Sequence, residues 1–365
     1  MISTRQPAII AALAATLATF APGGVAAQDA EYTIRFAAGF PPTTPQGRTA
    51  AWWMNEIEER TDGRVEFEPY WIGSLVGSNE ILGAVQDGLV DVGVAYTIAF
   101  PGELPLAQLG NLPFLTRDPW VIQRAFADLM EEFPAFEEEL ARNNVVYLAN
   151  TPTGGTGILS KTPVKTLDDV NGLKTFTIGV YADAVSAGGA SPVSLAWSES
   201  YEALQHGVVD SAVMYPMSIL ANKFNEVTDH FTYLGETGGL GQDLIFAIAN
   251  EDFWDGLPPD LQETMRTTLV EAEDVWIDIF RDVIETDLGA LRDGDGVEPM
   301  GFYTMDEAEV EKWRQTMGDP LETWAEENSD LADTRAIVAR YKELEAKYQE
   351  QFANGAGAAS GPPAN

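Results

Sequence analysis

The stretch EILGAVQDGLVD, residues 80–91, recurs in altered form as ESYEALQHGVVD, residues 199–210. Both copies fit the pattern E-x-x-x-A-V/L-Q-x-G-x-V-D, which predicts a helix that ends at Gly88 or Gly207 and leads directly into a strand. Glycine suits the left-handed end of a helix because it has no Cβ. The copies start 119 residues apart, too far for a solenoid, which favours two similar lobes facing a shared crevice. Chance similarity of two amphipathic helices is the alternative.

The sequence outside these copies also alternates between strand and helix. Residues 32–37 and 65–70 alternate as strands, and an amphipathic helix is predicted between them over residues 50–60. Strands that alternate with helices indicate an α/β fold with parallel strand pairs. Acidic and apolar residues at helical spacing predict a long helix over residues 260–292.

The first 27 residues differ in kind from the rest. Arg5 precedes an apolar stretch over residues 7–20, and small residues lead to a predicted cut after Ala27, so we expect a cleavable secretory signal and a periplasmic protein. A retained anchor is the alternative. At the other end, the Gly-, Ala-, Ser- and Pro-rich residues 354–365 are expected to be disordered.

Charge and cysteine content limit the possible partners. The chain carries a formal net charge of −36, which would repel nucleic acid and anionic lipid, and an anionic ligand would need strong local compensation. The chain has no cysteine, so an exported protein must be stabilised by its core without disulfides.

Several blocks, in order, resemble the solute-binding proteins of TRAP transporters, the DctP-like family. The resemblance implies an α/β, two-lobed periplasmic binding protein fold with hinge strands and long C-terminal helices. It also implies a receptor that encloses a small organic solute and delivers it to TRAP membrane permease subunits, without catalysis or cofactor. The matching blocks are residues 61–65, 73–77, 84–91, 112–114, 169–174, 189–193 and, most extensively, 198–210.

Lobe boundaries follow from this expected fold. Lobe I is expected to comprise residues 28–152, with residues of about 240–283 returning to it. Lobe II is expected to comprise residues 153–239, with about 284–350 packing on it and across both lobes.

The sequence departs from the family where the ligand should bind. The family normally has an arginine two positions beyond the lysine of Gly-Leu-Lys, and this arginine binds the ligand carboxylate; here Phe176 stands in its place. Residues 154–157, GGTG, contain no second arginine. Because a buried carboxylate without a cation loses charge-assisted hydrogen bonds, we expect a neutral, cationic or zwitterionic solute, unless Arg48 meets the anion.

The remaining side chains near the inferred cleft are mostly aromatic, and aromatic rings bind cations and stack on planar groups. For each aromatic residue, a place in the core is the alternative, and for Arg48 it is a solvated charge at a helix start. The candidate ligand-binding residues are Phe40, Arg48, Trp71, Tyr96, Thr156, Phe176, Tyr181, Trp197, Met214 and Tyr215.

Catalytic chemistry has little support in the sequence. The chain has no cysteine and only two histidines, His206 and His230, neither at metal-ligand spacing, and it lacks a nucleophile elbow and a P-loop. Residues 154–157 could cradle an oxyanion, but a tight turn between strands is the simpler reading. A ligand-binding sensor receptor remains an alternative, as does an exported α/β hydrolase or lyase.

Overall fold

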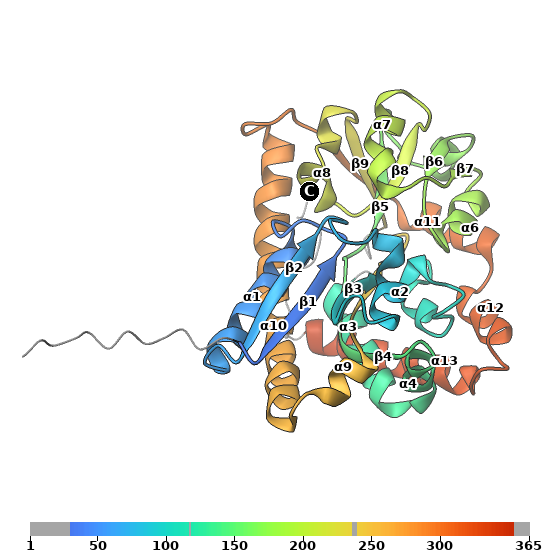
Figure 1. The fold of residues 1–365 in the computed structure, drawn as a ribbon. Helices are drawn as coiled ribbons and strands as arrows, with labels where there is room; N and C mark the ends of the chain where they lie inside the picture. The colour runs from blue at the N-terminus through green and yellow to red at the C-terminus, as the bar shows by residue number, and fades with distance from the viewer. Residues whose placement is uncertain (1–29, 117, 236–238, 354–365) are drawn as a thin grey trace, which may run out of the picture.

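The computed structural model describes residues 30–116, 118–235 and 239–353. The expected signal peptide, residues 1–27, and the expected disordered tail, residues 354–365, lie outside the described residues. The described chain forms two α/β units, each around its own sheet (Figure 1).

Lobe I is the unit around a five-stranded sheet with the order β2-β1-β3-β10-β4. Strand β1 is parallel to β2 and β3, whereas β10 is antiparallel to β3 and β4. Its strands are β1 (Tyr32–Ala38), β2 (Val65–Trp71), β3 (Val92–Tyr96), β4 (Val145–Pro152) and β10 (Leu244–Asn250).

Lobe II is the unit around a six-stranded sheet with the order β11-β9-β5-β8-β6-β7. Strand β6 is parallel to β7 and β8, and β5 is antiparallel to β8 and β9. Its strands are β5 (Gly157–Ser160), β6 (Lys174–Phe176), β7 (Ser191–Val193), β8 (Ser211–Met214), β9 (His230–Leu234) and β11 (Gly301–Met305).

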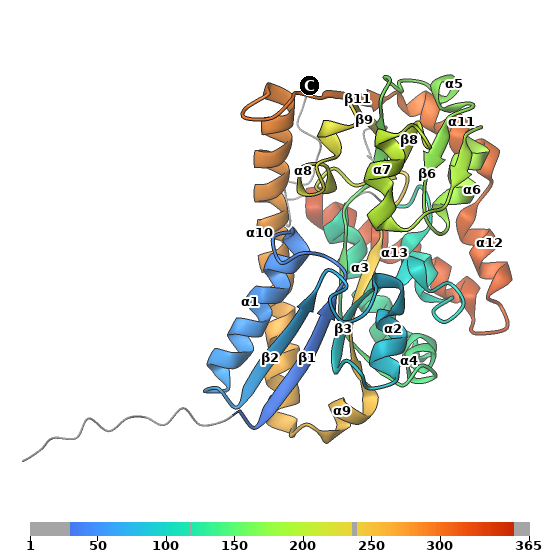
Figure 2. The ribbon, with the colours of Figure 1, turned by 45° about the horizontal axis from the view of Figure 1, so that its top comes forward.

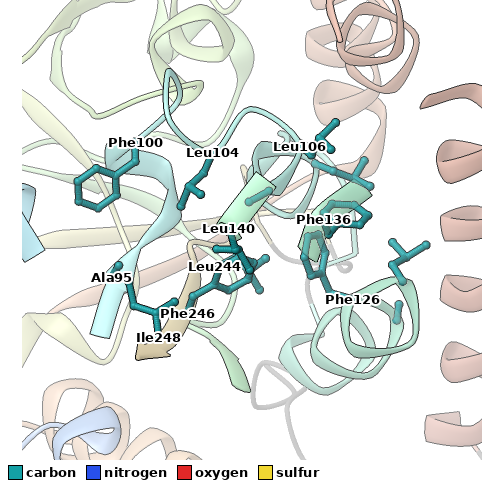
Figure 3. Close-up of a cluster of buried hydrophobic side chains, with 14 of the residues drawn as sticks. Ala95, Phe100, Leu104, Leu106, Phe126, Phe136, Leu140, Leu244, Phe246 and Ile248 are labelled. Carbon is teal, nitrogen blue, oxygen red and sulfur yellow. The ribbon is translucent and has the colours of Figure 1, made fainter. Parts of the chain in front are cut away.

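Helices cover both sheets. In lobe I, buried phenylalanine and leucine side chains from several elements form the cluster drawn in Figure 3, which includes Phe126, Phe136 and Phe246. The helices of lobe I are α1 (Pro45–Arg60), α2 (Ile81–Gln86), α3 (Pro119–Glu132), α4 (Pro134–Ala141) and α9 (Glu251–Gly256). The helices of lobe II are α5 (Leu167–Val170), α6 (Tyr181–Ala187), α7 (Ser200–Gln205), α8 (Ser218–Ala221) and α11 (Glu307–Met317).

Three further helices follow in the C-terminal part of the chain, and the first of them connects the lobes. The long helix α10 (Pro259–Asp293) runs along one side of the molecule, past both lobes (Figures 1 and 2). Its Leu269 is buried in a lobe I cluster and its Leu291 in a lobe II cluster. After α11, helices α12 (Pro320–Glu327) and α13 (Thr334–Ala353) return to lobe I, where α13 packs on α3. The expected α/β, two-lobed fold with hinge strands and long C-terminal helices is thus confirmed.

The repeated sequence folds the same way in both lobes. In lobe I, Asp91 Oδ2 accepts a hydrogen bond from Arg35 N at 2.8 Å. In lobe II, Asp210 Oδ2 accepts one from Lys174 N at 2.9 Å. The strand orders β2-β1-β3 and β7-β6-β8 correspond, so each aspartate joins two neighbouring parallel strands of its lobe, β1 and β3 or β6 and β8.

Each sheet also contains an inner strand from the other half of the chain: β10 in lobe I and β5 in lobe II. Next to β3 in lobe I lies β10, and next to β8 in lobe II lies β5, so the chain crosses between the sheets after β4 and again after β9. The two crossings run side by side, since Thr156 N donates to Gly241 O at 2.8 Å and Thr153 N donates to Asp243 O at 3.0 Å. Residues 154–157 therefore belong to the crossing from β4 to β5, which lie in different sheets, and they do not form the expected tight turn between strands.

The glycine turns of the repeat lie on opposite lobes but point away from the lobe boundary. Gly88 and Gly207 have φ of 67° and 70°, as the left-handed helix end requires. Each turn precedes its strand, whereas the ends of β3 and β8 meet at the boundary. Helices that return between parallel strands run opposite to them, so the end of α2 or α7 lies at the far edge of the sheet.

Replacing Asp91 or Asp210 with alanine should reduce stability more than solute affinity. We expect a loss of about 2–3 kcal/mol for Asp91→Ala and about 1–2 kcal/mol for Asp210→Ala, because backbone donors lose their partner. The Asp91 effect is larger because its carboxylate also binds the Arg35 guanidinium, at 2.5 Å, and is less exposed. Denaturant midpoints measure the loss, and Asp87→Ala, an exposed site on the same turn, is the control. An affinity lost at unchanged stability would contradict this scaffold role.

Candidate functional site

Tyr96 and Tyr215 occupy equivalent positions in the two copies of the repeat and meet at the lobe boundary. Tyr96 ends β3 and Tyr215 follows β8, each 16 residues after the first glutamate of its copy. Their hydroxyls interact, and burial raises the pKa of each, that of Tyr215 further through its proximity to Tyr96. The two related halves of the chain therefore converge on this pair.

The segments after the two tyrosines insert into opposite lobes. Ile98, in lobe I by sequence, is buried in a cluster of lobe II, where Gly179 would place a Cβ only 2.4 Å from Ile98 Cγ1. Its equivalent in the second copy, Met217, is buried in the main cluster of lobe I, and Gln46 Nε2 lies 3.5 Å from its Sδ. This reciprocal insertion couples the position of one lobe to that of the other.

Aromatic rings continue from the tyrosine pair into both lobes. In lobe I, Phe40 contacts Tyr96 at 6.2 Å and Trp71 at 6.3 Å between ring centroids. In lobe II, Trp197 stacks on Tyr215 at 5.6 Å with an interplanar angle of 7°. The structure thus brings five of the aromatic residues chosen from the sequence into one continuous arrangement.

Asp243 lies beside these tyrosines and was not among the residues selected from the sequence. It stands directly before β10, is only 3% exposed, and influences the pKa values of Tyr96, Tyr181 and Tyr215. Burial raises the pKa of Asp243 to about 6, while the nearby Tyr181 hydroxyl acts to lower it. That hydroxyl lies beside the carboxyl without normal hydrogen-bond geometry, so Tyr181 Oη and Asp243 Oδ1 both lack a partner within the described residues.

The Tyr181 ring can pack beside Asp243 because residue 241 is a glycine and leaves space for it. A Cβ on Gly241 would lie 2.4 Å from Tyr181 Cε1, so any larger residue would displace the ring. Burial and the nearby Asp243 raise the pKa of Tyr181 far above its ordinary value. The phenol groups around Asp243 therefore remain neutral at physiological pH.

The other four candidates lie elsewhere. Thr156 is 2% exposed, and its hydroxyl bonds to both Gly241 O and Gly241 N within the hinge. Met214 is fully buried in a lobe II cluster, on the strand position before Tyr215. Phe176 is 1% exposed in the same cluster, and its ring centroid lies 6.2 Å from that of Trp197. Arg48 is exposed and forms an ion pair with Asp282 at 3.7 Å.

A separate cavity of about 60 Å³ lies inside lobe I between the sheet, α1 and α10. Four polar atoms of its lining residues lack a hydrogen-bond partner within the described part of the chain: Gln123 Oε1, Asn150 Oδ1, Trp276 Nε1 and Glu273 Oε2, which forms an ion pair with Arg124. Its remaining lining is largely apolar and includes Phe36 and Phe40. Phe40 therefore stands between this cavity and the tyrosine pair.

Two further properties concern residues 30–116, 118–235 and 239–353. Within them, no cluster of three or more His, Cys, Asp or Glu side chains has an arrangement that could hold a metal ion. Over the same residues, no helix combines the length and apolar character needed to span a bilayer.

A sequence signal for Asp243 was present. The residue lies between a glycine-rich stretch, residues 238–241, and the wholly apolar residues 244–249. An acidic residue directly before a fully buried strand should be charged and enclosed, and perturbed carboxyl groups concentrate at functional sites.

Two related α/β lobes, joined by crossing strands and converging on aromatic residues, define a binding protein of the kind that closes by hinge motion around a ligand. Residues 36–328 match the model of the bacterial extracellular solute-binding proteins, family 7, also called DctP, and the chain belongs to this family. It is 30% identical to the C4-dicarboxylate-binding periplasmic protein DctP of Rhodobacter capsulatus, over 85% of this chain and 90% of that protein. It is 29% identical to the ectoine/5-hydroxyectoine-binding periplasmic protein UehA of Ruegeria pomeroyi, over 77% of this chain and 81% of that protein.

Solved structures have the same fold. A TRAP periplasmic solute-binding protein of Bordetella bronchiseptica, with bound (R)- and (S)-mandelate, superposes with a TM-score of 0.74 at 25% identity, covering 87% of this chain and 99% of that one. A second TRAP periplasmic solute-binding protein, from Desulfovibrio salexigens, superposes with a TM-score of 0.75 at 24% identity, covering 90% of this chain and 98% of that one. The chain is thus the extracytoplasmic solute receptor of a TRAP-type transporter, and is not an enzyme.

Proposed function

We propose that the solute binds between the lobes where Tyr96 and Tyr215 meet, and that the loaded receptor delivers it to TRAP membrane permease subunits. The observation that carries this proposal is the reciprocal insertion of Ile98 and Met217 next to the tyrosine pair. A solute held by both tyrosines would stabilise the closed arrangement, in which these side chains occupy the opposite lobe. The receptor would then work in the periplasm, after cleavage of the signal peptide at residue 27.

The moving units are the two lobes. We take lobe I to comprise residues 28–152 with about 240–283, and lobe II to comprise residues 153–239 with about 284–350. The two hinge crossings and α10 are the connections that must bend. Hinges of this kind absorb their motion in a few residues, and binding energy alone drives closure.

Within this site, the candidates contribute differently. Phe40, Trp71, Tyr96, Tyr181, Trp197 and Tyr215 would form the walls, and Asp243 joins them. Phe176 would act through Trp197, since its ring packs against that side chain from the core. Thr156 would hold the hinge rather than the solute.

The relatives bind chemically different solutes, so their names do not fix this one. They include proteins named for C4-dicarboxylate and for ectoine or 5-hydroxyectoine, and a structure contains mandelate. The chain here has Phe176 in place of the family arginine, and its boundary is lined by tyrosines and a carboxyl group. The solute class must therefore be argued from these side chains.

A thermal-shift screen of carboxylates, betaines, aromatic acids, polyols and sulfonates tests the proposed site. A compound that binds the site, added at a concentration of about 100 times its Kd, should stabilise the wild type by about 2.7 kcal/mol and so raise the melting temperature. Tyr215→Ala should abolish this shift, because the ring is lost from the lobe boundary.

Tyr303→Ala is the matched control, since Tyr303 lies on β11 at the far edge of the lobe II sheet. It should retain the shift in full. If no compound stabilises the wild type, or if Tyr215→Ala responds as strongly as Tyr303→Ala, the proposed site is wrong.

A further inference from the structure

Asp243 is a buried carboxyl group without an adequate partner. Its side chain is 3% exposed and Oδ1 receives no hydrogen bond from the described residues. Among residues 30–116, 118–235 and 239–353, the one polar neighbour with an effect on its ionisation is the Tyr181 hydroxyl, which itself has no hydrogen-bond partner there. Buried charges in proteins are normally paired, because an uncompensated charge loses its solvation without a compensating interaction.

The described part of the chain supplies no cation for this carboxyl group. Within the described residues, no lysine or arginine contributes to the ionisation of Asp243. The groups that act on its ionisation or respond to its charge are the phenols of Tyr96 on β3, Tyr181 on α6 and Tyr215 directly after β8. A phenol can donate one hydrogen bond but cannot neutralise a negative charge.

The backbone holds this carboxyl group in a fixed place. Asp243 N donates to Thr153 Oγ1 at 3.0 Å, and Thr153 N donates to Asp243 O at 3.0 Å. The next residue is fixed as well, since Leu244 N donates to Asn111 Oδ1 at 2.7 Å, and Asn111 is fully buried. A charge held this firmly without a partner fits a site that is preorganised for a missing counter-ion.

We propose that the solute carries a cationic nitrogen and that Asp243 is its counter-ion, an inference that rests on the proposed function. The aromatic rings around the carboxyl group suit the same ligand, because ring faces attract ammonium groups most strongly when water is excluded. The net charge of −36 also favours the approach of a cation over that of an anion. A solute whose only charge is a carboxylate would instead bring two negative groups together.

Calorimetry with a matched pair of probes tests this assignment. Choline and its neutral carbon isostere, 3,3-dimethylbutan-1-ol, have nearly the same shape and differ in charge. We expect the wild type to bind choline about 10-fold or more tightly than the isostere, as a charge-assisted contact implies. Asp243→Asn should remove this preference, and Asp183→Asn, the same change at an exposed residue on α6, should retain it.

The dependence on pH gives a second readout in the unmodified protein. The pKa of Asp243 is about 6, and the phenols of Tyr96, Tyr181 and Tyr215 have raised pKa values, so they stay neutral. Choline keeps its charge at every pH. Its affinity should therefore fall about 10-fold between about pH 7.5 and about pH 5, as the carboxylate takes up a proton. Asp243→Asn should show no such fall.

Three outcomes would overturn the proposal: choline binding no tighter than its isostere, no choline binding at millimolar concentration, or an affinity that does not change with pH. Preferential binding of succinate or benzoate, lost in Tyr215→Ala, would reject the cationic solute but leave the receptor site standing. If no compound in the broader screen binds, the proposed site itself fails.

Discussion

Replacing Asp243 with asparagine is expected to stabilise the solute-free protein at neutral pH, although it weakens the binding of a cationic solute. The folded-state pKa of about 6 lies above the ordinary value of 3.8, so folding opposes ionisation of this group. The difference corresponds to a gain of about 1–3 kcal/mol when the charge is removed. Few substitutions stabilise a protein while they weaken the binding of its ligand, and this combination marks a group kept for function.

The sign of the pH effect follows from the same shift. Because the folded pKa is raised, the contribution of Asp243 to stability is most favourable below about pH 4 and is lost as the pH rises to about 6. The advantage of Asp243→Asn should thus be full at about pH 7.5 and close to zero near about pH 4. Denaturant midpoints at several pH values measure it, with Asp183→Asn as the control. If Asp243→Asn is the less stable protein at neutral pH, the carboxylate has a structural partner and the interpretation is wrong.

Phe176→Ala should cause one of the largest losses of stability in the chain, about 3–4 kcal/mol. The ring is 1% exposed and packs with Leu204, Phe224 and Trp197. Removing it leaves a cavity behind Trp197, which in turn supports Tyr215. We expect a smaller effect on affinity, through the loosened Trp197 ring.

Phe176→Arg tests whether the position can still serve as a carboxylate clamp. A guanidinium in this cluster would be a buried charge without a partner, so lobe II should be destabilised further and carboxylate affinity should not appear. Phe302→Ala, on the edge strand β11 with a partly exposed ring, should cost less than Phe176→Ala. A Phe176→Arg protein of normal stability that binds succinate would contradict the core assignment.

The repeat was sufficient to predict two related lobes, because a helix stop, a strand start and a capping aspartate are all local features. The exchange of strands was beyond such reasoning. Placing β10 beside β3, and β5 beside β8, depends on pairings between distant segments that local patterns do not specify. For the same reason, the local pattern of residues 154–157 predicts a tight turn between strands and cannot show that these strands belong to different sheets.

The candidate site was partly predictable. Aromatic residues just beyond strand ends, such as Tyr96 and Tyr215, follow from the rule that ligands bind where strands end. Met214 and Phe176 point into the core because alternate strand residues face opposite sides, and a prediction from sequence cannot tell which side faces the boundary. Asp243 was overlooked because it lies in the returning part of the chain, whose contact with the first three strands appears only in the fold.

A crystal structure with a solute identified by the thermal-shift screen tests most directly whether the ligand binds between the lobes. We expect the solute to contact Tyr96 from lobe I and Tyr215 from lobe II, with a cationic nitrogen within hydrogen-bonding or ion-pair distance of the Asp243 carboxylate. A solute bound wholly inside lobe I, in the cavity beside Trp276, with the contact between Tyr96 and Tyr215 unchanged, would contradict this.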